Sequence, residues 1–132
     1  MSFTANCSCV IITLALATLT LTFSEGYKSY NVHIINRFCN NDKPLTVHCK
    51  SGDDDLGNHT LWRGQDYNWQ FNGNFWGTTL FHCNMKRDSQ ERDIIVFSIA
   101  DEEPLECMKT KDCFWFVNED GFYVGNKKFD WR

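Results

Sequence analysis

Two-residue alternation of apolar and polar side chains recurs along the chain after residue 27, and no helical period replaces it. This alternation is typical of strands that bury one face. It is present in residues 30–34, 45–49, 67–71 and 79–85. DIIVFSIA at 93–100 and CFWFV at 113–117 are apolar on both faces, so both are predicted to be central strands.

Turn residues separate these segments. The run Asn118-Glu119-Asp120-Gly121 predicts a hairpin, because Asp-Gly supplies the positive φ that a tight turn requires. A second turn is predicted at 125–128. Seven or eight short strands, spaced by polar and Gly-containing turns, predict an all-β sandwich or barrel.

Residues 1–26 are predicted to be a secretory signal peptide. The run VIITLALATLTLTF at 10–23 has 14 residues without a charge, fewer than the roughly 20 needed to span a bilayer. Ser24 and Gly26 offer small side chains before a predicted cleavage at Tyr27. The alternative is a buried helix, which the lack of a polar face disfavours. Residues 27–132 are therefore expected to form one secreted, extracellular domain without a membrane span.

Five cysteines lie beyond the predicted signal peptide: Cys39, Cys49, Cys83, Cys107 and Cys113. Small secreted domains have modest cores and use disulfides to supplement them. Because five is an odd number, these cysteines cannot all pair within one molecule.

Charge and motifs exclude several classes of function. Lys and Arg number 13 against 17 Asp and Glu, a net charge of -4, so no basic face for nucleic acid or anionic membranes is expected. The histidines are scattered, and the sequence has no serine elbow and no phosphate loop. Cys49 beside His48 is a poor catalytic pair, since neighbouring strand residues point to opposite faces. No catalytic residue, metal site or cofactor is predicted, and the protein is not expected to be an enzyme.

Three features are candidates for surface sites. The acidic run at 53–55 lacks the alternate ligand spacing of an EF-hand loop, which favours a solvated turn over a calcium site. Asn58-His59-Thr60 is an N-glycosylation acceptor and predicts a surface position for Asn58. Trp62 and Trp76 lie in polar surroundings, whereas Trp69 and Trp115 lie in strand patterns and are predicted to be core.

The run LTVHCKSGDDDLG at 45–57 is followed by WQF at 69–71, TLFHC at 79–83, CFW at 113–115 and DGFY at 120–123. In this order and spacing the chain resembles the plant self-incompatibility S1 family, the S-protein homologues, over essentially all of residues 30–125. The resemblance implies a small secreted antiparallel β-sandwich of about 7–8 strands, without an enzymatic role. The founding function of the family is that of a pistil-secreted ligand that triggers rejection of self pollen.

The family's four recurrent cysteines match Cys49, Cys83, Cys107 and Cys113, which implies two intramolecular disulfides that staple the sandwich. Cys39 is additional. A monomer is therefore expected, with a Cys39-linked dimer as the alternative.

The expected function is that of a secreted signalling ligand recognised by a protein receptor on another cell, of the type used in self-incompatibility. Specificity is expected on loops that a rigid sheet holds. The candidate receptor-binding segments are 51–65, with Asp53, Asp54 and Trp62, and 101–112. The alternative is a lectin-like cell-wall or glycan-binding defence protein that uses Trp62 and Trp76.

Overall fold

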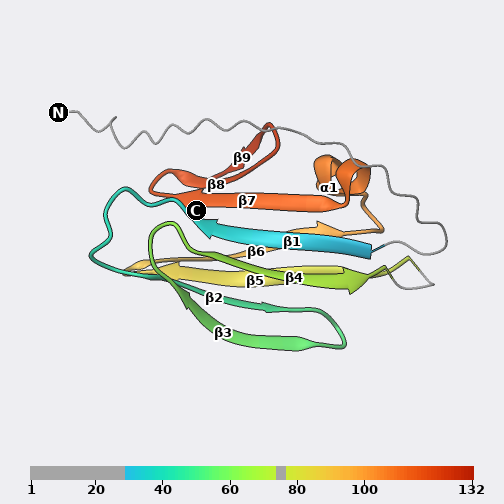
Figure 1. Cartoon of the computed structure of the whole chain (residues 1–132), viewed down its shortest axis with the longest axis horizontal. Coiled ribbons are helices and arrows are strands. Elements are labelled where there is room, and N and C mark those ends of the chain that lie inside the picture. Colours follow the sequence, from blue (N-terminus) through green and yellow to red (C-terminus); the bar gives the residue numbers. More distant parts are fainter. Residues whose placement is uncertain (1–28, 74–76) are drawn as a thin grey trace.

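The computed structural model describes residues 29–73 and 77–132, which form two β-sheets packed face to face and one short helix (Figure 1). The five-stranded sheet has the order β4-β1-β7-β8-β9, and the four-stranded sheet has the order β3-β2-β5-β6. The elements are β1 Ser29–Asn36, β2 Leu45–Lys50, β3 Asp55–Leu61, β4 Asp66–Asn72, β5 Leu80–Arg87, β6 Gln90–Ser98, α1 Leu105–Thr110, β7 Asp112–Asn118, β8 Gly121–Val124 and β9 Lys127–Phe129. The predicted all-β sandwich is confirmed, while the predicted signal peptide, residues 1–26, lies outside the described residues.

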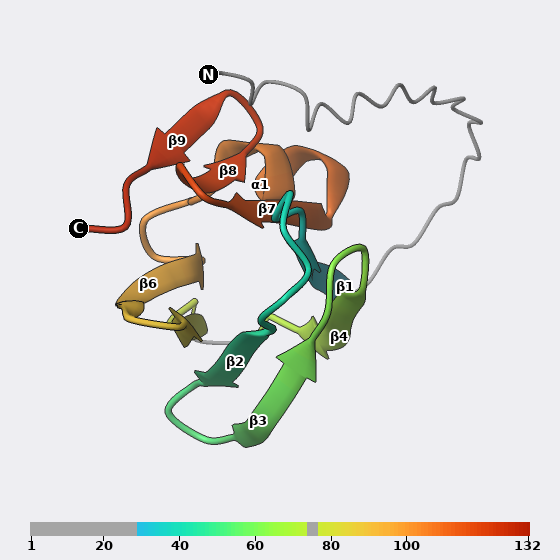
Figure 2. The same cartoon turned by 90° about the vertical axis from the view of Figure 1, so that its left-hand side faces the viewer.

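The chain crosses between the two sheets, so the pairing of strands differs from their order in sequence. β1 and β7 pair in parallel, with Ile34 opposite Trp115. The other strand pairs are antiparallel. Viewed from one end, the sheets form two layers, with β6 and β9 on the same side of the sandwich (Figure 2). On this side the neighbouring edges are β6 of one sheet and β9 of the other, and on the opposite side they are β3 and β4.

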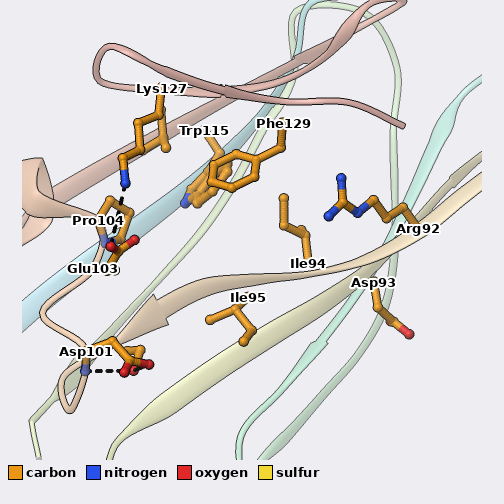
Figure 3. Close-up of a pocket in the computed structure, with 12 residues that line it drawn as sticks. Arg92, Asp93, Ile94, Ile95, Asp101, Glu103, Pro104, Trp115, Lys127 and Phe129 are labelled. Carbon is orange, nitrogen blue, oxygen red and sulfur yellow. Dashed lines mark hydrogen bonds and ion pairs between the residues drawn. The ribbon is translucent and has the colours of Figure 1, made fainter. Parts of the chain in front are cut away.

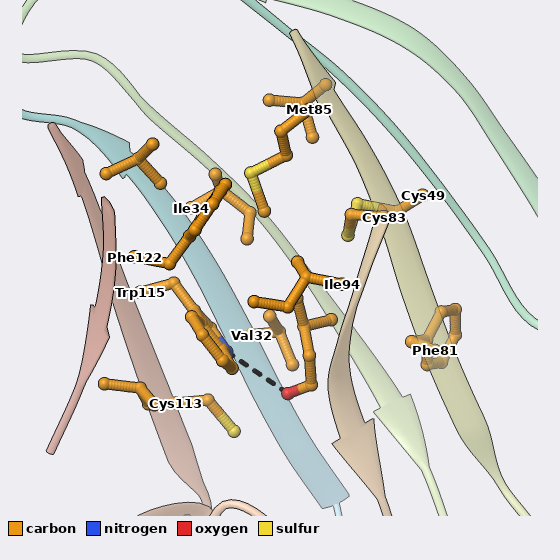
Figure 4. Close-up of a cluster of buried hydrophobic side chains, with 14 of the residues drawn as sticks. Val32, Ile34, Cys49, Phe81, Cys83, Met85, Ile94, Cys113, Trp115 and Phe122 are labelled. Carbon is orange, nitrogen blue, oxygen red and sulfur yellow. Dashed lines mark hydrogen bonds between the residues drawn. A yellow bond between two sulfur atoms is a disulfide. The ribbon is translucent and has the colours of Figure 1, made fainter. Parts of the chain in front are cut away.

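Alternate residues of the facing strands fill the space between the layers, as the two-residue period predicts. Val32, Ile34 and Val47 have no exposed surface, and Trp115 is 1 % exposed. The indole N–H of Trp115 donates to the carbonyl of Val96 at 3.2 Å, which joins the two sheets through the core (Figure 4). A buried donor thus has an acceptor, as burial of a polar group requires.

Disulfides reinforce both layers. Cys49 and Cys83 are bonded across the neighbouring strands β2 and β5. Cys107 and Cys113 are bonded between α1 and β7, six residues apart. All four side chains are fully buried. These bonds supply the pairing of these four cysteines, which the sequence left open.

The hairpin between β7 and β8 forms where it was predicted, but Gly121 has a different role from the one that the sequence suggested. Its two central residues are Glu119 and Asp120, and Asn118 is paired with Gly121. Gly121 has φ +149° and belongs to the returning strand. A Cβ at this position would lie 2.2 Å from the carbonyl oxygen of Phe129. The glycine therefore allows close approach of β9, rather than the turn itself.

Three elements differ from the sequence prediction. Residues 55–61, expected within a loop, form strand β3, and residues 105–110, also expected in a loop, form helix α1. The segment 93–100 was predicted to be a central strand, but β6 lies at the edge of its sheet. This last difference leaves apolar side chains at an open edge.

Candidate recognition surfaces

The acidic turn, residues 51–54, joins β2 to β3 and has a fixed backbone. The hydroxyl of Ser51 accepts the N–H of Asp53 at 3.3 Å and that of Asp54 at 3.1 Å. The N–H of Ser51 in turn donates to the carbonyl of Asp54 at 2.8 Å. Asp53 and Asp54 are exposed. Two carboxylates are therefore presented to solvent from a turn whose shape is set by its own hydrogen bonds.

Asp55 has a different environment from its two neighbours. Its Oδ1 accepts the N–H of Gly57 at 2.9 Å and lies 2.6 Å from Nε2 of His48. The register between β2 and β3 shifts here, and Gly57 adopts φ +80°, so residues 55–57 form a bulge. The Gly57 N–H first, and His48 second, hold the pKa of the Asp55 carboxyl below its ordinary value. The Asp-Leu-Gly part of the sequence is therefore structural.

A hollow of about 470 Å³ opens beside the acidic turn. Asp53 and Asp54 lie on one side of it, and Phe71, Leu80 and His82 contribute to the others. The two carboxylates therefore border a hollow whose other walls are partly apolar and aromatic. It suits a partner with a basic group next to an apolar side chain, by charge complementarity and burial of apolar surface.

The other predicted surface residues lie elsewhere. Trp62 is 42 % exposed and follows the far end of β3, where its N–H donates to Oε1 of Gln65 at 2.8 Å. Because β3 has seven residues, Trp62 lies about 20 Å from the acidic turn. The structure therefore does not join Trp62 to Asp53 and Asp54. Trp76, the second aromatic candidate, lies outside the described residues.

Asn58 is exposed, although it lies in strand β3 and not in the loop that the sequence suggested. β3 is an edge strand of its sheet. The acceptor motif is therefore on the surface, at an edge where a neighbouring strand does not cover it.

The second predicted segment, 101–112, contains α1 and is tied to β7 by Cys107–Cys113. Leu105 at the start of the helix is 58 % exposed. Lys111 ends the helix in the left-handed conformation. Figure 1 shows α1 at the same end of the sandwich as the turn between β2 and β3. The acidic turn of the first segment and the helix of the second are thus at one end, although on different layers.

The outer face of the five-stranded sheet has an aromatic row that the sequence prediction missed. The rings of His33 and Phe114 are stacked with centroids 4.4 Å apart, and Nδ1 of His33 is 3.1 Å from Asp66. The Arg37 guanidinium lies 4.4 Å above the ring of Phe116. The signal was present in CFWFV, where alternate aromatics must point away from the core.

A second hollow, of about 570 Å³, lies between the open edges of the two sheets (Figure 3). Its apolar part is formed by Ile94, Trp115 and Phe129. Lys127 and Glu103 form an ion pair of 3.5 Å at one end, and Arg92 lies at the other. We refer to this hollow as the edge groove. No sequence motif pointed to it, because it depends on which strands are at the edges.

Within residues 29–73 and 77–132, no group of three or more His, Cys, Asp or Glu side chains is arranged to hold a metal ion. No helix in this part of the chain is long and apolar enough to cross a membrane.

Comparisons with known proteins agree with this fold. Residues 31–132 match the family model of plant self-incompatibility protein S1. S-protein homolog 5 of Arabidopsis thaliana is 36% identical over 67% of this chain and 69% of its own length. S-protein homolog 29 of the same plant is 30% identical over 95% of this chain and 94% of its own length. Self-incompatibility protein S1 of Papaver rhoeas is 28% identical over 86% of this chain and 81% of its own.

A solved structure of an SPH (Self-Incompatibility Protein Homologue) protein has the same fold. It superimposes with a TM-score of 0.59 at 17% identity, and the match covers 79% of this chain and 90% of the other. Its family is described as small, highly stable, secreted proteins from plants. At this identity the likeness concerns the fold.

Proposed function

The chain belongs to the plant self-incompatibility protein S1 family, and on that premise we propose that it is a secreted signalling ligand recognised by a protein receptor at a cell surface. A related structure comes from a family of secreted plant proteins. Buried disulfides in a chain this small are typical of an oxidising, extracellular compartment. The proposal includes export with removal of residues 1–26.

The observation that carries the proposal is the acidic turn and its hollow. Asp53 and Asp54 are exposed, and Ser51 fixes the backbone that presents them. A receptor that binds such a preformed surface loses little conformational freedom of the ligand. The adjoining hollow of about 470 Å³ offers apolar contact beside the charges. We infer that the receptor presents a basic group to the turn and an apolar side chain to the hollow.

The ligand proposal predicts saturable binding of the labelled mature protein to intact target cells. Because the receptor is a protein, prior treatment of the cells with a protease should abolish the saturable part. Enzymatic removal of surface glycans should leave it intact. If glycan removal abolishes binding and protease does not, the protein is a glycan-binding protein, and its Trp62→Ala variant on a glycan array would then locate the site.

Glycosylation at Asn58 is part of the same proposal, because an exposed acceptor on an exported chain is available to the transferase. Protein secreted from a eukaryotic host should show increased gel mobility after treatment with an N-glycan amidase. Asn58→Gln should already have that mobility. Thr60→Ser retains the acceptor motif and is the matched control. A wild-type secreted chain of unmodified mass, beginning at or near Tyr27, would support export but exclude this modification.

A further inference from the structure

β6 is an unusual edge strand. It has nine residues, and its second half is apolar. Ile94 is 5 % exposed and faces the edge groove, whereas Ile95 is 52 % exposed on the opposite face of the sheet. Edge strands of soluble proteins are usually short, charged or covered, because open edges pair with other strands. A long edge with two adjacent isoleucines is therefore a candidate for pairing with a partner.

The hairpin between β5 and β6 fixes which backbone groups face outward. Arg87 and Gln90 close a two-residue turn, so they form a hydrogen-bonded pair, and such pairs alternate along an antiparallel ladder. It follows that the backbone groups of Glu91, Asp93 and Ile95 point away from β5. The described residues supply no hydrogen-bond partner to this outward row.

The row ends where the protein itself covers the edge. Ser98 exchanges two backbone hydrogen bonds with Glu103, of 2.9 and 3.0 Å. The carbonyl of Val96 already accepts the indole N–H of Trp115. The open part of the edge therefore extends from Glu91 to Ile95, enough for an extended segment of about five residues.

Hollows flank this row on both faces of the sheet. The edge groove, of about 570 Å³, lies on the inner side with Ile94, Trp115 and Phe129. A shallower hollow of about 280 Å³ opens on the outer side beside Leu80 and His82. Residues 93–95 border both hollows, which therefore meet at the edge of the strand. Successive side chains of a strand point to opposite faces, so a strand added to β6 places its side chains alternately in the two hollows.

Charges define the side chains that would fit. Arg92 faces the groove, where one of its N–H groups donates to the carbonyl of Asp130 and its other donors are left for a ligand (Figure 3). Arg92 and Ile94 are two residues apart, so they match a carboxylate and an apolar side chain that are also two residues apart. Asp93 lies on the outer side and favours a basic residue between them.

We propose that the β6 edge binds an extended peptide segment of a partner protein by strand addition. The segment has an acidic residue and, two positions away, a branched or aromatic residue that both enter the edge groove. The residue between them lies over the outer hollow. This site is separate from the acidic turn. The proposal for the β6 edge therefore does not depend on the receptor contact proposed at the turn.

The test begins with a phage library of random octapeptides selected on the folded, disulfide-bonded protein. The expected result is enrichment of sequences with an acidic residue two positions from Ile, Val, Phe, Tyr or Trp. A synthetic peptide of the enriched sequence is then titrated by fluorescence polarisation. Amide NMR shifts on binding should concentrate at Glu91, Asp93 and Ile95.

The decisive variants are a matched pair at one position. Asp93→Pro removes an outward N–H without touching the ladder to β5, and should weaken binding at least about tenfold. Asp93→Ala removes the same carboxylate but retains that N–H, so it is the matched reference, and Asp93→Pro should bind at least about tenfold more weakly than Asp93→Ala. Arg92→Gln should reduce the preference for the acidic residue. If circular dichroism shows that Asp93→Pro does not fold, the peptide affinity of Ile95→Lys and the amide shifts of the wild type serve as the test instead.

Several outcomes would overturn the proposal. They are a library without the expected enrichment, binding that Asp93→Pro leaves unchanged, or amide shifts away from residues 91–95. Analytical sedimentation of the protein alone could give one more contradicting outcome. A dimer of the wild type that Asp93→Pro dissociates would show that the edge binds a second copy of the chain instead.

Discussion

The Asp55 carboxylate fixes a bulge, whereas its neighbours Asp53 and Asp54 project into solvent. The difference comes from the Gly57 N–H and the His48 ring, which both lie within hydrogen-bonding distance of Oδ1 of Asp55. The sequence candidates for recognition were Asp53 and Asp54, without Asp55. The strand boundary at Asp55 gives that carboxylate a structural role and leaves the other two exposed.

This arrangement predicts the pH dependence of the bulge. Because the folded state lowers the pKa of Asp55, ionised Asp55 stabilises the fold above the ordinary aspartate pKa. That contribution is lost as the pH falls through the lowered folded value. Carboxyl NMR should show Asp55 titrating below an ordinary aspartate. His48→Ala should raise its pKa only part of the way, because the hydrogen bond from Gly57 remains. A titration of Asp55 at or above the ordinary aspartate value would contradict this account.

At the scale of elements, the two disulfides are predicted to contribute unequally. Cys49–Cys83 spans 34 residues and Cys107–Cys113 spans 6. In the chain-entropy model, removal of the longer link costs about 4 kcal/mol and removal of the shorter about 2 kcal/mol. Urea unfolding of the two paired Cys→Ala variants measures both free energies. Equal losses, or a larger loss for Cys107 and Cys113, would refute the ranking.

Elements with a clear two-residue period were predictable from the sequence. In β2 the inward residues are apolar and the outward ones are polar, and β1 and β5 follow the same pattern except at Ile35, Asn36 and Leu80, so the local pattern determines the face. β3 was missed because its sequence, DLGNHTL, contains a bulge glycine and few apolar residues. α1 was missed because six residues with one buried side chain give no helical period.

The place of a strand within its sheet is a tertiary property. β7 and β6 are both apolar on two faces, yet β7 is interior and β6 is at an edge. In β7 the outward aromatics are covered in part by β1, where His33 stacks on Phe114. In β6 the apolar residues line the two hollows. A local pattern cannot distinguish these cases, since both produce the same run of residues.

At the scale of the whole molecule, the crossover of strands between sheets decides which candidate residues are neighbours. The acidic turn and α1 are at one end of the sandwich, and Trp62 follows the opposite end of β3 (Figure 1). The sequence predicted the acidic turn as a surface site. It could not predict the hollow beside it, which needs the end of β4 and the start of β5 at the same place.

The central claim is that this acidic turn is the surface that the receptor recognises. Its most direct test is the association rate with target cells across a salt series, for the wild type and for Asp53→Asn with Asp54→Asn. The matched control is Asp88→Asn with Asp120→Asn, which removes the same charge from the two hairpins at the other end. We predict that the Asp53 and Asp54 variant associates more slowly at low salt and that the difference shrinks as salt screens the charges, while the control stays close to the wild type. Equal association rates for the wild type and the Asp53 and Asp54 variant at every salt concentration would contradict the claim.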